Sequence, residues 1–242
     1  MKDIQYIAGL FDAEGYIRLT SKGGVDTKLE MTDLECIKYY AEHFNLPIRT
    51  QVRANRKLIY NCTTSKHTMT KEVLTAMLPY LNEKYFQAKC VLMYLKGGDL
   101  NTCHSAFVRN RYHDTIINKP SLNYIAGMMD GDGWISFQNS KHHGMQLTLG
   151  LQQCYKGLST HLHKTYGGHL STAPGKEVQH RSTTAWIISK EKSLELIAHL
   201  KSFVIRNKKK IELIERYYNT SKEMEKNRVE ALEKIWNEYS TI

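Results

Sequence analysis

The sequence lacks the features of membrane, secreted and zinc-bound proteins. No apolar run approaches the roughly 20 residues that a helix needs to cross a bilayer, so we expect no membrane-spanning segment. The five cysteines are scattered, odd in number and without a Cys-x-x-Cys pair, which argues against a disulfide framework and a structural zinc site. The first residues contain an early acid, and we expect no signal peptide. These absences favour a soluble protein of a reducing compartment that is not secreted.

Acidic residues are also in short supply. The 242 residues include 24 Asp and Glu against 34 Lys and Arg, which gives a formal net charge of +10. Such an excess favours an anionic partner: DNA, RNA or a membrane surface. A hydrophobic content of 41% and an aromatic content of 10% are typical of a globular protein. The length suffices for one large domain or two small ones.

One long segment occurs twice. YIAGLFDAEGYIRL begins at Tyr6, and YIAGMMDGDGWISF begins 118 residues later at Tyr124. This offset is nearly half the chain and far exceeds the period of a solenoid, so it predicts two related halves. Period-2 and helical patterns follow each copy and predict the order αββαββα plus an extra helix in each half. We expect strands at 28–32, 48–53 and 58–64 and at 146–153, 169–172 and 184–188, and closing helices at 70–78, 83–95, 190–200 and 208–218.

Composition shifts divide the chain into an N-terminal half, 1–95, and a C-terminal half, 121–242. Between them, residues 96–120 open with Gly-Gly, end with Pro and show weak periodicity, which predicts a long connector. The charged stretch 221–239 carries one apolar stripe and is interpreted as a solvated helical tail.

Each repeated segment carries small residues four positions apart. Gly9 and Ala13 would share one helical face in the first copy, as would Gly127 and Gly131 in the second. Small residues at this spacing let two helix backbones approach closely. We therefore expect the two motif helices to pack on each other with their C-terminal ends together.

Acids stand at the ends of these helices, where backbone carbonyls already carry partial negative charge. Packing of the two helices would bring Glu14 and Asp132 side by side, near the main-chain carbonyls of Ala13 and Gly131. Such an oxygen-rich, anionic pocket suits a hard divalent cation, Mg²⁺ or Mn²⁺. Two such ions can activate a water and stabilise the leaving oxygen in phosphodiester cleavage.

Two further acids, Asp12 and Asp130, precede these by two residues and so lie about 200° around the helix. We interpret them as mainly structural, either buried or capping. An alternative for each copy is that the acids only make local hydrogen bonds while Gly15 and Gly133 act as left-handed helix caps. The same acid and glycine spacing in both copies favours the metal site.

The segments IAGLFDAEG (7–15) and IAGMMDGDG (125–133) resemble the LAGLIDADG motif of homing endonucleases, and two copies in one chain resemble the monomeric members. The resemblance covers nearly the whole chain. It implies an α+β saddle made of two αββαββα repeats, with antiparallel four-stranded sheets and the motif helices at the central interface.

The same resemblance implies an activity and its partners. It implies a DNA endonuclease that cuts both strands of a long, asymmetric target and leaves staggered ends, with Mg²⁺ or Mn²⁺ bound by Glu14 and Asp132. Ca²⁺ would occupy the site without supporting cleavage. It also implies a monomer that binds double-stranded DNA without a protein partner, in a DNA-containing compartment: an organelle matrix or stroma, or a prokaryotic cytoplasm.

The family often places a catalytic lysine at the start of the helix that closes each half, where it stabilises charge near the scissile phosphate. In the first half PYLNEKYFQAK puts this lysine at Lys84. In the second half a gapless alignment reaches Asn207, with Lys208 next, so either the register shifts to Lys208 or this lysine is absent. Simple surface charge or a phosphate contact is the alternative for both lysines.

The major groove admits a two-stranded β-ribbon, whose outward side chains can then reach base edges. Alternation assigns that face, and its residues are rich in Arg, Gln, Asn, Ser and Thr. The candidates of the first half are Tyr16, Arg18, Thr20, Lys22, Lys28, Glu30, Arg49, Gln51, Arg53, Asn61 and Thr63. Those of the second half are Trp134, Ser136, Gln138, Ser140, Gln146, Thr148, Gln152 and Thr183. Lys22 and the basic stretch 206–210 are candidates for phosphate contacts.

Two other functions remain open. Some members of this family act as intron maturases, and the same basic surface would bind the protein's own intron RNA. A catalytically silent DNA-binding protein on this fold is the other alternative. Retention of both Glu14 and Asp132 favours nuclease activity over either.

Overall fold

The computed structural model describes residues 3–52, 58–110, 113–140, 144–174, 182–189, 191–223, 234–235 and 237–239. The first half contains α1 (Ile4–Glu14), β1 (Gly15–Leu19), β2 (Val25–Met31), α2 (Leu34–Phe44), β3 (Ile48–Val52), β4 (Leu58–Thr64), α3 (His67–Met77) and α4 (Tyr85–Leu95). A connecting helix, α5 (Leu100–Arg109), follows. The second half contains α6 (Leu122–Gly131), β5 (Gly133–Ser140), β6 (Gly144–Gln153), α7 (Lys156–Tyr166), β7 (His169–Ala173), β8 (Thr183–Ser189), α8 (Glu191–Leu200) and α9 (Lys208–Glu223).

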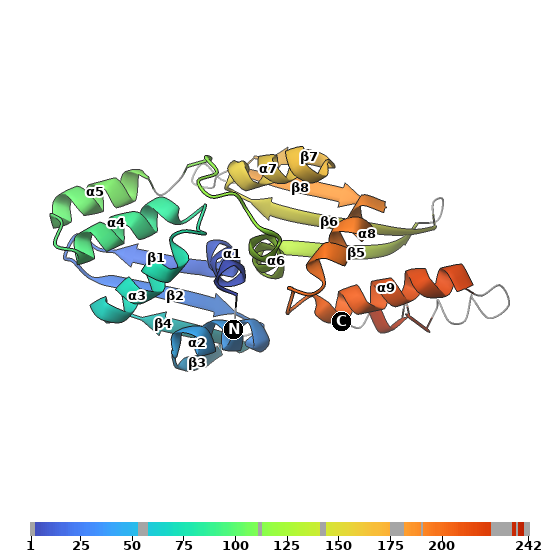
Figure 1. The fold of residues 1–242 in the computed structure, drawn as a ribbon, viewed down its shortest axis with the longest axis horizontal. Helices are drawn as coiled ribbons and strands as arrows, with labels where there is room; N and C mark the ends of the chain where they lie inside the picture. Colours follow the sequence, from blue (N-terminus) through green and yellow to red (C-terminus); the bar gives the residue numbers. More distant parts are fainter. Residues whose placement is uncertain are drawn as a thin grey trace.

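Two four-stranded antiparallel sheets flank the central helices α1 and α6 (Figure 1). Their strand orders, β1-β2-β4-β3 and β5-β6-β8-β7, are the same by position in each half. One face of each sheet carries the apolar residues of the strand alternation and packs against helices, as Ile17, Leu29 and Leu149 show. The predicted α+β saddle of two αββαββα repeats is confirmed.

The central helices begin in the same way, 118 residues apart. The side chain of Asp3 accepts hydrogen bonds from the backbone at the start of α1, and that of Ser121 does so at the start of α6. Such caps satisfy amide groups that have no partner within the helix. Helix formation is therefore encoded in both copies of the repeat, although the capping residues differ.

The two helices pack through their glycines, as the small-residue spacing predicts. A Cβ atom added to Gly9 would collide with the backbone carbonyl of Tyr124, and one added to Gly127 would collide with that of Tyr6. A Cβ on Gly131 would meet Ala13 and would lie 3.1 Å from Cγ of Glu14. Backbone-to-backbone contact at the centre of the molecule thus requires glycine.

Gly127→Ala is expected to lower the free energy of unfolding by about 3 kcal/mol, because the new methyl must displace backbone atoms of α1. Urea unfolding of the full chain measures the change. Gly24→Ala is the matched control, since a Cβ atom there meets nothing closer than the Thr20 hydroxyl at 3.0 Å. Equal losses in the two variants would contradict close packing at Gly127.

The structure differs from the expected elements at several places: β2 begins at Val25 and α3 at His67, each three residues earlier than expected. Helix α4 begins at Tyr85, two residues later than expected, because residues 82–84 form a loop that binds an aspartate (below). The connector contains α5, and its later part is bound to the first half: Oδ1 of Asn82 accepts hydrogen bonds from the backbone of Ile117 and Asn118, both at 2.9 Å.

Most of the expected tail at 221–239 lies outside the described residues. Within the described part of the chain, no helix is long and apolar enough to span a membrane.

Candidate active site

Asp12, near the end of α1, is fully buried and anchors the loop that precedes α4. Its carboxylate accepts backbone hydrogen bonds from Asn82 at 2.6 Å, Glu83 at 3.2 Å and Lys84 at 2.8 Å. The hydroxyl of Tyr124, on α6, donates to the same carboxylate at 2.7 Å. Burial raises the pKa of Asp12, and Lys84 and these hydrogen bonds oppose the shift.

Asp130 occupies the equivalent position on α6 and does the same for the second half. It accepts a hydrogen bond from the hydroxyl of Tyr6 at 2.8 Å. A tyrosine hydroxyl on each motif helix therefore donates to the buried aspartate of the other. Its backbone donors are Ile205 at 2.5 Å, Arg206 at 3.2 Å and Asn207 at 3.1 Å. The interpretation of Asp12 and Asp130 as structural acids is confirmed.

These bonds align the two anchored loops residue by residue. Residues 82–84 correspond to 205–207, so Asn207 stands where the first half has Lys84. Lys208 is exposed at the start of α9 and lines a separate surface hollow with Lys201 and Glu215. The suggested register shift is therefore absent, and Lys208 is not the structural counterpart of Lys84.

In each half, a cationic side chain nevertheless donates hydrogen bonds to backbone carbonyls at the C-terminal end of the motif helix. The ammonium of Lys84 donates a hydrogen bond to the carbonyl of Asp12 in the last turn of α1. On α6, Nη1 of Arg206 donates to the carbonyl of Asp130 at 3.0 Å and to that of Gly131 at 3.3 Å. Positive charge at a helix C-terminus offsets the partial charge of its free carbonyls. From sequence, Arg206 was expected only to contact phosphate, as part of the basic stretch 206–210, and its place at the end of α6 was not predicted.

Glu14 and Asp132 are half-buried at the converging ends of α1 and α6. Burial raises the pKa of Glu14, and the nearby charge of Asp132 raises it further, against the opposing effects of Arg206 and Lys84. Burial also raises the pKa of Asp132. Gly15 has extended backbone angles, so the alternative of a left-handed glycine cap at the end of α1 is wrong.

Gln153 and Glu83 extend the site on the Asp132 side. The side-chain amide of Gln153 donates to Asp132 at 3.1 Å and lies 3.4 Å from the carboxylate of Glu83. Burial raises the pKa of Glu83 to about 7, an effect that Lys84 opposes and Asp12 and Asp132 reinforce. The sequence did hold a signal for Gln153: it occupies an inward position of β6 after three inward leucines.

The donor set fits a divalent ion that is shared with a substrate. Within the described residues, no group of three or more His, Cys, Asp or Glu side chains could hold a metal. Mg²⁺, however, usually keeps several waters and takes only one or two carboxylates plus phosphate oxygens. Glu14 and Asp132 supply two carboxylates whose charges disfavour each other. The carbonyl of Gly131 already accepts one hydrogen bond from Arg206.

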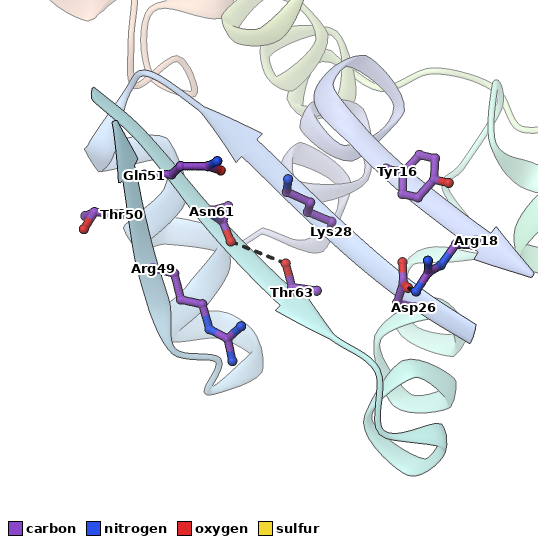
Figure 2. A pocket seen from close by; sticks show the side chains of 9 residues that line it. All are labelled: Tyr16, Arg18, Asp26, Lys28, Arg49, Thr50, Gln51, Asn61 and Thr63. Atoms are coloured by element: carbon purple, nitrogen blue, oxygen red, sulfur yellow. Dashed lines mark hydrogen bonds and ion pairs between the residues drawn. The ribbon is translucent and has the colours of Figure 1, made fainter. Parts of the chain in front are cut away.

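The outward face of the first sheet forms an open hollow of about 500 Å³. Strand pairing places most of the predicted residues on this face, in the rows Tyr16–Lys28–Thr63 and Glu30–Asn61–Arg49. Arg18 lies opposite Asp26 and forms an ion pair with it (Figure 2), and Lys28 pairs with Glu30. Asp26 is not among the residues predicted from the sequence. Gln51 also lines the hollow, whereas Thr20 and Lys22 lie in the turn that follows β1, and Arg53 lies outside the described residues.

The outward face of the second sheet carries fewer charged side chains than that of the first. Trp134, Ser136, Gln146, Thr148 and Gln152 lie on its outward face, and Gln152 donates to the Thr183 hydroxyl at 2.7 Å. The ring of Trp134 lies against the backbone of Gly150 on the neighbouring strand, where a Cβ atom would collide with it. The side chains of Gln138 and Ser140 lie outside the described residues.

Two acid-ended helices in backbone contact, flanked by matching antiparallel sheets, define a two-repeat saddle. No family model and no curated protein matches the sequence. Among solved structures, the fold is that of LAGLIDADG homing endonucleases, which confirms the resemblance at the level of fold. I-GzeII in complex with its DNA target has a TM-score of 0.72 and 12% identity over 97% of both chains.

Two further structures show the same likeness. I-CpaMI, a LAGLIDADG meganuclease bound to uncleaved DNA, has a TM-score of 0.71 and 12% identity over 99% of both chains. I-SmaMI, bound to an uncleaved DNA target in the presence of calcium ions, has a TM-score of 0.63 and 16% identity over 99% of this chain and 97% of its own.

Proposed function

We propose that the protein is a site-specific, metal-dependent endonuclease of the homing type that cuts both strands of a long, asymmetric DNA target and leaves staggered ends. The observation that carries this proposal is the meeting of Glu14 and Asp132 at the ends of two packed helices, between two polar sheet faces. The DNA-bound structures of I-GzeII and I-CpaMI, which share the fold, support it.

The side chains at this junction take distinct roles in the proposed reaction. Glu14 and Asp132 would hold Mg²⁺ or Mn²⁺, Ca²⁺ would occupy the site without supporting cleavage, and the carbonyls of Ala13 and Gly131 are the further candidate ligands. When bound, the metal supplies an activated water and charge stabilisation at the phosphate. Lys84, held by the loop on Asp12, supplies a fixed positive charge near the scissile phosphate.

The two sheets grip the duplex, and they do so with different chemistry. Arg18, Lys28 and Arg49 on the first sheet offer charged donors, for which guanine is the preferred base. Gln146, Thr148 and Gln152 on the second offer neutral groups suited to adenine and thymine. Unequal faces, together with unequal acids in the two motifs, match a target without twofold symmetry.

One chain is enough for this arrangement. Helix α6 supplies the packing partner that α1 requires, so the active protein is a monomer with no protein partner, acting in a compartment that contains DNA.

Selection from a randomised duplex library tests the function directly. Incubation of the full chain with the library in Mg²⁺, followed by capture and sequencing of cut ends, is expected to enrich one family of long asymmetric sequences with a constant stagger. A Glu14→Gln, Asp132→Asn double variant and a chelator control should enrich nothing. Absence of enrichment by the wild-type protein, or equal enrichment by the double variant, would overturn the proposal.

A further inference from the structure

We propose that Arg206 is the catalytic cation of the second centre, in place of a lysine, so that each DNA strand is cut by a chemically different centre. The inference rests on the proposed endonuclease function and names a residue that the two-lysine pattern does not contain. It follows from the geometry of the two anchored loops.

The position that corresponds to Lys84 cannot supply the charge in the second half. It is occupied by Asn207, which is buried and whose side-chain amide donates to the carboxylate of Asp130 at 2.9 Å and to the carbonyl of Met129 at 3.1 Å. A neutral amide held in this way is fixed within the protein. The second centre must take its positive charge from elsewhere.

Arg206, one residue earlier, delivers a charge to the equivalent place. Its guanidinium binds the carbonyls of Asp130 and Gly131, as the Lys84 ammonium binds that of Asp12. Both carbonyls accept their hydrogen bonds from Nη1, whereas the whole guanidinium has five N–H donors. Arginine also forms bidentate contacts with phosphate, so the remaining donors suit a phosphate group at the end of α6.

The charges around the two motif acids are not equivalent. Glu83 corresponds to Arg206 by position, which inverts the charge between the halves. Lys84 thus acts beside a second carboxylate, with Nζ 3.9 Å from Oε1 of Glu83.

The two cations also differ in chemistry. Arginine stays protonated at any pH at which a protein is folded, so Arg206 can stabilise charge and orient a phosphate but does not transfer a proton. Lysine can do both. At the phosphodiester hydrolysed beside it, Arg206 therefore contributes charge and orientation but no proton, and the two strands should respond separately to changes at positions 84 and 206.

Strand-resolved cleavage of a supercoiled plasmid that carries the selected target tests this assignment. Arg206→Gln is expected to slow the cutting of one strand by about 100-fold, the loss typical for removal of one preorganised donor, and to leave nicked plasmid. Lys84→Gln should spare that strand and slow the other. Arg206→Lys should recover at least about tenfold of the lost rate, because the charge is retained. Arg216→Gln, which removes an exposed arginine of α9 that pairs with Glu238, should cut like the wild-type protein.

The outcomes separate this inference from the proposed function. Failure of the wild-type protein to cut any library sequence would end both. If the wild-type protein cuts, equal slowing of the two strands by Arg206→Gln, with a lower urea midpoint, would show that Arg206 only caps α6 and would overturn the inference alone. Unchanged cutting by Arg206→Gln, or strand-selective nicking by Arg216→Gln, would overturn it as well.

Discussion

Glu14→Gln and Asp132→Asn are each expected to abolish double-strand cutting while DNA affinity stays within a few-fold of the wild type. Both substitutions keep the shape of the side chain and remove a charge from a pocket in which the other carboxylate lies close by. A divalent metal held by these carboxylates would supply several kcal/mol of charge stabilisation, so its loss should slow cleavage by about 1,000-fold or more. Plasmid linearisation in Mg²⁺ measures the first effect, and fluorescence anisotropy of a labelled target duplex in Ca²⁺ measures the second.

Glu35→Gln provides the matched control, because this acid lies exposed on α2 and pairs with Lys38 at 2.7 Å. It should cut at the wild-type rate. Normal cutting by either motif variant would contradict the metal role. A parallel loss of affinity and of folding stability would show that the acid holds the helix ends together instead.

The repeat predicted the fold because its signals are local and occur twice. Small residues four apart predicted the backbone contact of α1 with α6, and Gly9 and Gly127 now lie there. Helical geometry separated Asp12 and Asp130 from Glu14 and Asp132, and both structural aspartates proved to be buried anchors. Strand alternation assigned the outward face of each sheet because a period of two leaves little freedom in register.

The sequence was less informative where the two halves use residues at different aligned positions for the same contact. Alignment compares like positions, so it reached Asn207 and could not show that Arg206 meets the end of α6 from one residue away. Asp26 was missed because the expected strand began at residue 28, whereas β2 begins at Val25; strand register then places Asp26 opposite Arg18 across the hairpin. Such pairings depend on tertiary geometry, which no local pattern encodes.

Asp12→Asn is expected to destabilise the protein by about 4 kcal/mol, the range seen when a buried hydrogen-bond network is broken. The carboxylate accepts four hydrogen bonds, three from the backbone of residues 82–84 and one from Tyr124. An asparagine keeps one acceptor oxygen and turns an NH₂ group toward donors that it cannot satisfy. Urea unfolding of the full chain measures the loss.

Tyr124→Phe separates the contribution of the network from that of packing, because it removes one donor and leaves the three backbone bonds in place. Its expected cost is about 2 kcal/mol, that of a single hydrogen bond to a charged group. Because Asp12 also holds the backbone of Lys84, Asp12→Asn should reduce cutting even below its unfolding range, whereas Tyr124→Phe should cut nearly normally. An Asp12→Asn protein as stable and as active as the wild type would show that the loop before α4 is positioned by other contacts, and Asp12 would then have no anchoring role.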